Sequence, residues 1–236
     1  AREAKAIFSN LEKYLVTIDC TRDEAVLADF FDAKLAEKRR EYLRGHQVAA
    51  IDYTQATIPL AEYLMGEVLP FSRYDNERSI AHVVDGFKPA QRKIMWTMCT
   101  AYRDVATPTI KVAQLSGEVA KRTWYKHGED SLNGTAMKMA ADYPICGNNM
   151  NLLTPGGMYG NRHGDDPASP RYVFTCCEAI ASYVFPEGDF PVLDMLECEG
   201  HVIEPVCMVP VLPIVLCNGT SGVGTTTCCK KVTRLR

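Results

Sequence analysis

A series of short helical patterns followed by a hairpin pattern constrains the fold of this chain more than any other feature. Apolar residues recur at helical spacing in three neighbouring stretches, and short strand-like segments then flank a Pro-Gly-Gly turn. Several short helices followed by a small hairpin is the order of a winged helix-turn-helix domain. The pattern therefore predicts an α+β fold. The helical stretches are 89–96, 111–123 and 131–143, and the strand-like segments are 152–153, 158–159 and 172–174.

The segments on either side of this series have different patterns. Residues 1–45 are helical and charged, and the periodicity lapses between Val48 and Pro59, as expected of a linker. We therefore predict three domains, over residues 1–50, 51–200 and 201–236. Further helices are predicted over 58–64, 76–84 and 175–185, and further strands over 206–209 and 212–217.

Charge is segregated along the chain, although the formal net charge of its 236 residues is only −3. Nine lysines and arginines lie between Arg78 and Lys126, whereas the stretch from Glu187 to Glu204 has six acidic residues and no basic one. Such segregation indicates one basic face that the total charge conceals.

The ten cysteines do not suggest a disulfide-rich secreted domain. Two pairs are vicinal, Cys176-Cys177 and Cys228-Cys229, and no C-x-x-C motif occurs, which disfavours both disulfides and a zinc site. We interpret them as reduced thiols of an intracellular protein.

The longest apolar run, from Val206 to Cys217, is interrupted by prolines and is too short to span a bilayer. Because the chain begins without methionine, we expect it to be a fragment of a larger protein.

Two clusters of basic residues suit the binding of phosphate groups. The turn from Asp85 to Pro89 places Lys88 at the start of a helix that also carries Arg92 and Lys93, where backbone N–H groups and cations both favour anions. A capped helix with an exposed basic edge is an equally good interpretation of this pattern. The second cluster is Tyr125, Lys126 and His127, for which a structural or surface role is a comparable alternative.

A glycine-rich segment from Gly219 to Gly224 holds Val223 between two glycines. The segment has no G-K-[ST] sequence, so a nucleotide-binding P-loop is a poor match. An exposed apolar tip of this kind could wedge between base pairs of a bent duplex. Ordinary packing of Val223 within a buried hairpin would give the same pattern.

An arginine directly precedes a tyrosine at Arg171-Tyr172, after a polar loop that contains Arg162. Such a pair is by itself usually structural. With phosphate-binding clusters elsewhere in the chain, it suggests that Tyr172 is a nucleophile that attacks a DNA phosphate, since phosphoryl transfer by a side-chain hydroxyl needs nearby positive charge. Arg162 and Lys34 are also predicted to bind DNA.

Long motifs in this chain resemble those of the eukaryotic-type IIA DNA topoisomerases, in the same order and over nearly the whole length. They are Asn76-Glu77-Arg78-Ser79-Ile80, Val84-Asp85-Gly86-Phe87-Lys88-Pro89, Gln91-Arg92-Lys93, Lys111-Val112-Ala113-Gln114-Leu115, His127-Gly128-Glu129, Ser131-Leu132, Ser169-Pro170-Arg171-Tyr172, Glu204-Pro205, Val209-Pro210, Leu212-Pro213 and Asn218-Gly219.

The resemblance implies a role for each candidate residue. Tyr172 would form a 5′-phosphotyrosyl link and Arg171 would stabilise the transition state, while Val223 would intercalate and bend the DNA. The remaining residues would grip the DNA backbone: Arg78, Lys88, Arg92, Lys93, Tyr125, Lys126 and His127. The resemblance further implies a winged-helix domain between a segment leaving a TOPRIM domain and the beginning of a tower domain.

The family resemblance also implies partners and cofactors that lie largely outside this chain. The complete enzyme would be a homodimer that passes one DNA duplex through another, with ATP and Mg²⁺ bound by domains that are missing here, and no metal ligands are expected in this chain. The expected location is the nucleus, or a viral replication compartment for a viral source. The chain alone is expected to bind DNA without relaxing supercoils.

Departures from the family pattern leave alternatives open. Lys126 replaces a usual histidine, Val223 replaces a usual isoleucine, and the loop before Tyr172 reads Gly164-Asp165-Asp166-Pro167 without the usual lysine. These changes indicate a divergent member, of protist or viral origin. A winged-helix module that binds DNA without cutting it is an alternative function. A metal-dependent nuclease is disfavoured by the lack of a carboxylate cluster near Tyr172.

Overall fold

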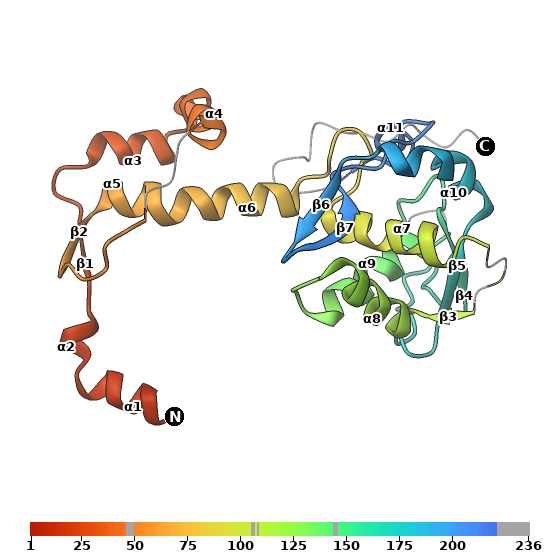
Figure 1. The fold of residues 1–236 in the computed structure, drawn as a ribbon, viewed down its shortest axis with the longest axis horizontal. Coiled ribbons are helices and arrows are strands. Elements are labelled where there is room, and N and C mark those ends of the chain that lie inside the picture. The colour runs from red at the N-terminus through yellow and green to blue at the C-terminus, as the bar shows by residue number, and fades with distance from the viewer. Residues whose placement is uncertain (46–49, 105–106, 108, 144–145, 221–236) are drawn as a thin grey trace. The chain divides into compact units, whose positions relative to one another are not determined.

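The computed structural model describes residues 1–236 except 46–49, 105–106, 108, 144–145 and 221–236 (Figure 1). The chain divides into two compact units, Ala1–Asn76 and Glu77–Arg236. The three-domain division at residues 50 and 200 remains a prediction.

The first unit consists of short helices and a two-stranded parallel sheet, in which Ile18 lies opposite Ile58. Its strands are β1 (Thr17–Asp19) and β2 (Thr57–Pro59). Its helices are α1 (Arg2–Ser9), α2 (Leu11–Tyr14), α3 (Glu24–Phe31), the 3₁₀ turn η1 (Ala33–Leu35), α4 (Ala36–Gly45), α5 (Leu60–Tyr63), the π-helical turn η2 (Leu64–Val68) and α6 (Leu69–Ser79).

Side chains from distant parts of the sequence hold the first unit together. Arg73 donates hydrogen bonds to the carbonyls of Tyr42 and Leu43, at 2.7 and 2.9 Å, and so satisfies acceptors that the end of α4 leaves free. The buried Asp29 of α3 accepts a hydrogen bond from Tyr42 and pairs with Lys38 at 2.5 Å. These contacts fix α3, α4 and α6 to one another.

The second unit contains the predicted winged helix. Its helices are α7 (Pro89–Ala101), α8 (Val112–Thr123), α9 (Glu129–Ala140), α10 (Ala179–Val184), the 3₁₀ segment η3 (Glu187–Val192) and α11 (Ile214–Asn218). Its strands are β3 (Ile110–Lys111), β4 (Leu153–Gly156), β5 (Phe174–Cys177), β6 (Met195–Cys198) and β7 (His201–Pro205).

Helices α7, α8 and α9 pack together beside a three-stranded antiparallel sheet of order β3-β5-β4 (Figure 1). Apolar residues at helical spacing fill the space between them, for example Ile94, Leu115 and Leu132, each at most 1% exposed. The element order α7-β3-α8-α9-β4-β5 is that of a winged helix, in which the loop 157–173 between β4 and β5 is the wing. The predicted α+β fold is therefore confirmed.

The hairpin itself differs from the prediction. Strand β4 continues through Pro155 and Gly156, where the sequence predicted a turn, and it pairs with β5 so that Pro155 lies opposite Thr175. Because β4 is an edge strand, the missing N–H of proline costs no hydrogen bond within the sheet. The predicted helix 175–185 is also shorter, because residues 174–177 belong to β5.

The strands predicted over 206–209 and 212–217 are wrong. The described chain forms no strand there, and Ile214–Asn218 is the helix α11. Pro210 and Pro213 lack the N–H groups that a central strand needs. Instead the acidic stretch forms the β6–β7 hairpin, in which Cys198 pairs with His201. The predicted helix 76–84 ends at Ser79, and the following segment leads to the turn at Gly86, whose φ is +70°.

A buried ion pair fastens this turn to the rest of the second unit. Asp85 is fully buried and accepts hydrogen bonds from Arg92 Nε at 2.6 Å and from the backbone N–H groups of Phe87 and Met208. Met208 is 123 residues away in sequence. The carboxylate therefore joins the start of α7 to the segment that follows β7.

Candidate nucleic-acid interface

Tyr172 lies at the end of the wing, immediately before β5. The backbone carbonyls of Val173 and Pro170 accept hydrogen bonds from the N–H groups of Val112 and Ala113, at 3.1 and 3.2 Å. These donors belong to the first turn of α8, whose N–H groups have no acceptor within the helix. A turn hydrogen bond from Tyr172 N–H to the Ser169 carbonyl, 2.9 Å long, closes the loop. The backbone around Tyr172 is thus held on the N-terminus of α8.

Tyr172 itself is 69% exposed. Its neighbour Arg171 is also exposed. Among the described residues, neither the Tyr172 hydroxyl nor the Arg171 guanidinium takes part in a hydrogen bond or ion pair. Val173, in contrast, is 1% exposed and anchors the end of the loop in the core. A fixed backbone with two unengaged polar side chains suits a group that acts on an external ligand.

A second set of predicted residues meets at the other end of α8. Lys93 Nζ donates to the carbonyl of Thr123, the last residue of α8, at 2.6 Å. Partial burial lowers the pKa of His127, and the positive charges of Arg78 and Lys93 lower it further. Because the charges of Arg78 and Lys93 both act on this imidazole, the two cations lie near His127, whose lowered pKa favours its neutral form. Arg78 and Lys93, together with His127, are called the cationic cluster. The negative end of the α8 dipole favours cations at this position.

The two ends of α8 are too far apart to hold one phosphate. The helix has twelve residues, so about 17 Å separates the backbone supports of Tyr172 from the cationic cluster. This length corresponds to about five base pairs along a duplex. Within this chain, the cationic cluster and Tyr172 therefore cannot contact the same phosphate.

The three basic residues predicted from the Asp85–Lys93 motif differ in how their charges are used. Arg92 is 5% exposed, and its guanidinium binds the Asp85 carboxylate and the Phe87 carbonyl. It therefore has a structural role here, which its position in a basic run concealed. Lys93 is largely buried and is engaged by Glu204 and Thr123.

Lys88 is the member of this motif whose charge remains unused within the described chain. Pro89 begins α7, and the Gln91 side chain accepts a hydrogen bond from Lys88 N–H at 2.9 Å. The ammonium group of Lys88 forms no ion pair among the described residues. A lysine beside a helix N-terminus is well suited to bind phosphate.

Replacing Lys88 by glutamine is expected to weaken duplex binding at all sequences and to lower the slope of log Kd against log salt by about one. Binding of a fluorescent duplex at several salt concentrations measures both quantities. Lys5→Gln, an exposed lysine of α1 with the same change in charge, is the matched control. Equal salt slopes for wild type and Lys88→Gln would show that Lys88 does not contact phosphate.

The remaining predicted residues occupy different places. Tyr125 is half-buried and its ring meets that of His127 edge-on, with centroids 5.4 Å apart. Arg162 is exposed on the wing, and Lys34 is exposed in the first unit. Val223 lies outside the described residues.

Lys126 forms an ion pair that the sequence did not indicate. Its ammonium group binds the carboxylate of Glu199, at the turn of the β6–β7 hairpin. A hydrogen bond from Lys126 lowers the pKa of Glu199, and Glu199 together with Cys198 raises the pKa of Lys126. No local pattern could have revealed this contact, because 73 residues separate its partners.

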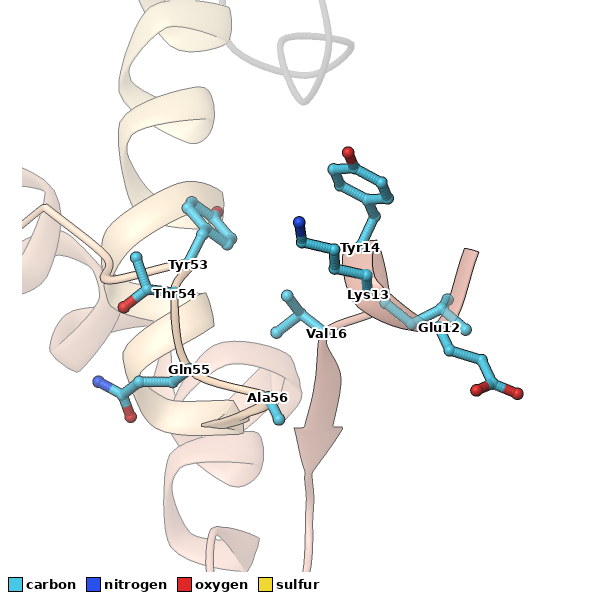
Figure 2. A pocket seen from close by; sticks show the side chains of 9 residues that line it. Glu12, Lys13, Tyr14, Val16, Tyr53, Thr54, Gln55 and Ala56 are labelled. Carbon is cyan, nitrogen blue, oxygen red and sulfur yellow. The ribbon is translucent and has the colours of Figure 1, made fainter. Parts of the chain in front are cut away.

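Among the described residues, no metal site is evident beside Tyr172. No group of three or more His, Cys, Asp or Glu side chains that could hold a metal ion occurs in the part of the chain that the structure describes. A hollow of about 370 Å³ lies in the first unit, between residues 12–16 and 53–56 (Figure 2). Its lining includes none of the predicted site residues. Among the described residues, no helix is long and apolar enough to cross a membrane.

Comparison with known proteins assigns the chain to a protein family. The family model for the A subunits of DNA gyrase and topoisomerase IV matches residues 78–232, more than half of the chain. The chain belongs to this family. The resemblance seen in the sequence motifs is thereby confirmed.

Curated relatives and a solved structure agree with this assignment. DNA topoisomerase 2 of Leishmania chagasi is 40% identical over 230 residues, which cover 94% of this chain and 18% of the relative. DNA topoisomerase 2-alpha of Rattus norvegicus is 36% identical over 98% of this chain and 16% of its own length. This topoisomerase chain thus spans less than a fifth of either protein.

The DNA-binding, cleavage and re-ligation domain of Plasmodium falciparum topoisomerase II has a similar structure, with a TM-score of 0.69 and 35% identity. The match covers 95% of this chain and 31% of that one. The likeness therefore extends through both units of the chain.

Proposed function

We propose that this chain is the DNA-cleaving segment of a type II DNA topoisomerase and that Tyr172 is its nucleophile. The observation that carries the proposal is the exposed Tyr172 hydroxyl beside Arg171, on a loop whose backbone is fixed by α8. A side chain that must reach a phosphate on DNA has to be exposed, and its backbone has to be held in place. Family membership supplies the reaction class.

The proposed reaction exchanges one phosphodiester bond for another. Tyr172 Oη attacks a backbone phosphorus, loses its proton, and forms a 5′-phosphotyrosyl bond as the bond from phosphorus to the 3′ oxygen breaks. The departing 3′ oxygen takes up a proton and becomes a free 3′ hydroxyl. Its attack on the phosphotyrosyl bond reverses the step and reseals the strand without a new energy source. Arg171 would stabilise the charge that develops on the phosphoryl oxygens.

The remaining predicted residues would bind the duplex on either side of this phosphate. Arg78, Lys88, Lys126 and His127 would contact the backbone near the C-terminal end of α8 and the start of α7. Arg162 on the wing, together with Lys34 and Tyr125, completes the set. Arg92 and Lys93 were predicted to bind DNA as well, but they are held by Asp85 and Glu204 and would support the surface from within. Val223 would intercalate and bend the DNA, at a cost on the order of 1–6 kcal/mol that the backbone contacts offset.

The complete enzyme would act as a homodimer in which two tyrosines cut the two strands and ATP hydrolysis drives passage of a second duplex. Its location would be the nucleus. Mg²⁺ would supply electrostatic stabilisation of phosphoryl transfer. The described residues around Tyr172 do not fit a metal site, so the ligands would belong to another part of the protein and no step above depends on the ion.

Trapping of a covalent complex tests this proposal. The full-length protein is incubated with plasmid DNA and Mg²⁺, quenched with denaturant, and digested with nuclease, and the modified peptide is identified by mass spectrometry. We expect a nucleotide attached to Tyr172. Cut DNA with free ends and no adduct would indicate a nuclease. Salt-dependent binding without cutting would indicate a winged-helix DNA-binding module.

A further inference from the structure

The β6–β7 hairpin brings two glutamates to two of the cations that were predicted to bind DNA. Glu204 on β7 binds Lys93, and Glu199 at the turn binds Lys126. Directly after this turn, the first residue of β7 is His201, whose ring stacks on Trp124 with centroids 4.7 Å apart and an angle of 19° between the planes. An acidic hairpin therefore lies against the segment 123–127, at the C-terminal end of α8.

The two ion pairs differ in their exposure to solvent. The side chains of Lys93 and Glu204 are 12% and 2% exposed, and their charged atoms are 2.7 Å apart. Lys93 also binds the Thr123 carbonyl. Separation of this pair would leave a buried carboxylate without its cation, which is strongly unfavourable. The Lys93–Glu204 pair is therefore a permanent attachment of the hairpin to α7 and α8.

The Lys126–Glu199 pair is open to solvent on both sides. The side chains are 59% and 58% exposed, so either partner can be hydrated or can exchange for another ion. Exposed pairs of this kind contribute little net stability, because water and salt compete with them. Glu199 lies on a tight turn in which it and Gly200 have positive φ values, 53° and 78°. The hairpin thus holds one carboxylate near Lys126 without binding it firmly.

We propose that, in the absence of DNA, Glu199 occupies the position on Lys126 that a DNA backbone phosphate takes in the complex. A carboxylate oxygen and a phosphate oxygen both accept hydrogen bonds from an ammonium group, and the ammonium group serves one anion at a time. Glu199 is then a determinant of DNA affinity, because each binding event has to displace it. The inference rests on the DNA contact in the proposed function and is independent of the chemistry at Tyr172.

Displacement by DNA is physically reasonable. A duplex phosphate that binds Lys126 releases condensed counterions, a gain that the internal carboxylate does not provide. The buried Lys93–Glu204 attachment keeps the hairpin in place when Glu199 is released, so the released carboxylate remains close to the duplex. It would repel the backbone there. The exchange and the residual repulsion both reduce affinity.

A double-mutant cycle on DNA binding tests this inference. Dissociation constants for a short fluorescent duplex are measured with this chain at low salt for wild type, Glu199→Gln, Lys126→Gln and the double variant. We expect Glu199→Gln to bind about two to five times more tightly and Lys126→Gln to bind more weakly. In the Lys126→Gln background only the general repulsion of the duplex remains, so Glu199→Gln is expected to tighten binding there no more than the control Glu197→Gln does.

Glu197→Gln is the matched control, since Glu197 is an exposed glutamate of the same hairpin with no ion pair among the described residues. Equal tightening by both glutamate variants would show a general charge effect and overturn the inference. So would tightening by Glu199→Gln that is as large without Lys126 as with it, or a wild-type chain that does not bind duplex. Thermal unfolding of each variant checks that it is folded.

Failure of the proposed chemistry would look different. If the cycle shows coupling but no Tyr172 adduct forms in the full-length protein, the Glu199 inference stands and the cleavage function falls. If the adduct forms but the cycle shows no coupling, cleavage stands and Glu199 has no role in DNA affinity.

Discussion

Replacing Tyr172 by phenylalanine in the full-length protein is expected to abolish the covalent protein–DNA complex. Phenylalanine retains the ring and lacks only the hydroxyl that would attack phosphorus. Removal of a nucleophile commonly lowers the rate by at least about a thousandfold. Because Tyr172 is 69% exposed and its hydroxyl has no partner within the described chain, the substitution leaves folding nearly unchanged. DNA affinity is expected to stay within about twofold of wild type, since phosphate contacts dominate it.

The measurement is the yield of adduct after quenching with denaturant, together with the dissociation constant for the same duplex. Tyr183→Phe is the matched control, because Tyr183 is 78% exposed in the same unit and has no predicted role. It should leave the adduct unchanged. An adduct of normal yield in Tyr172→Phe would show that another residue is the nucleophile.

The helices of the winged helix could be predicted from the sequence because their pattern is local. Val112, Leu115 and Val119 recur at helical spacing, and all three are completely buried on one side of α8. The exposed tyrosine could be located only through its motif. The residue pattern predicted Tyr172 and Val173 as the first residues of a strand. In the structure both lie on the loop before β5, where Tyr172 is exposed and Val173 is buried.

The parts that were mispredicted depend on contacts between distant segments. Proline disfavours a strand, but Pro155 is tolerated in β4 because that strand lies at the edge of the sheet. A run of basic residues suggests a DNA-binding surface, yet Arg92 is buried on Asp85. Likewise Glu204 lies 111 residues from Lys93. Charge patterns show which residues are available for ion pairs, whereas the fold decides which of them remain free for a ligand.

Asp85→Ala is expected to lower the free energy of unfolding by about 3–5 kcal/mol, the range observed when one partner of a buried ion pair is removed. The Arg92 guanidinium would then have no carboxylate partner. It would remain buried, because its side chain is only 6% exposed. The substitution also removes the acceptor for the N–H groups of Phe87 and Met208, at 2.9 and 3.0 Å. Urea unfolding followed by circular dichroism measures the change.

A second variant separates the lost charge pairing from the lost backbone contacts. In Asp85→Ala/Arg92→Met the unpaired cation is gone, so part of the stability should return, while the N–H groups of Phe87 and Met208 still lack their acceptor. We expect the double variant to lie between wild type and Asp85→Ala. A loss below about 1 kcal/mol for Asp85→Ala would contradict the structural role of this pair.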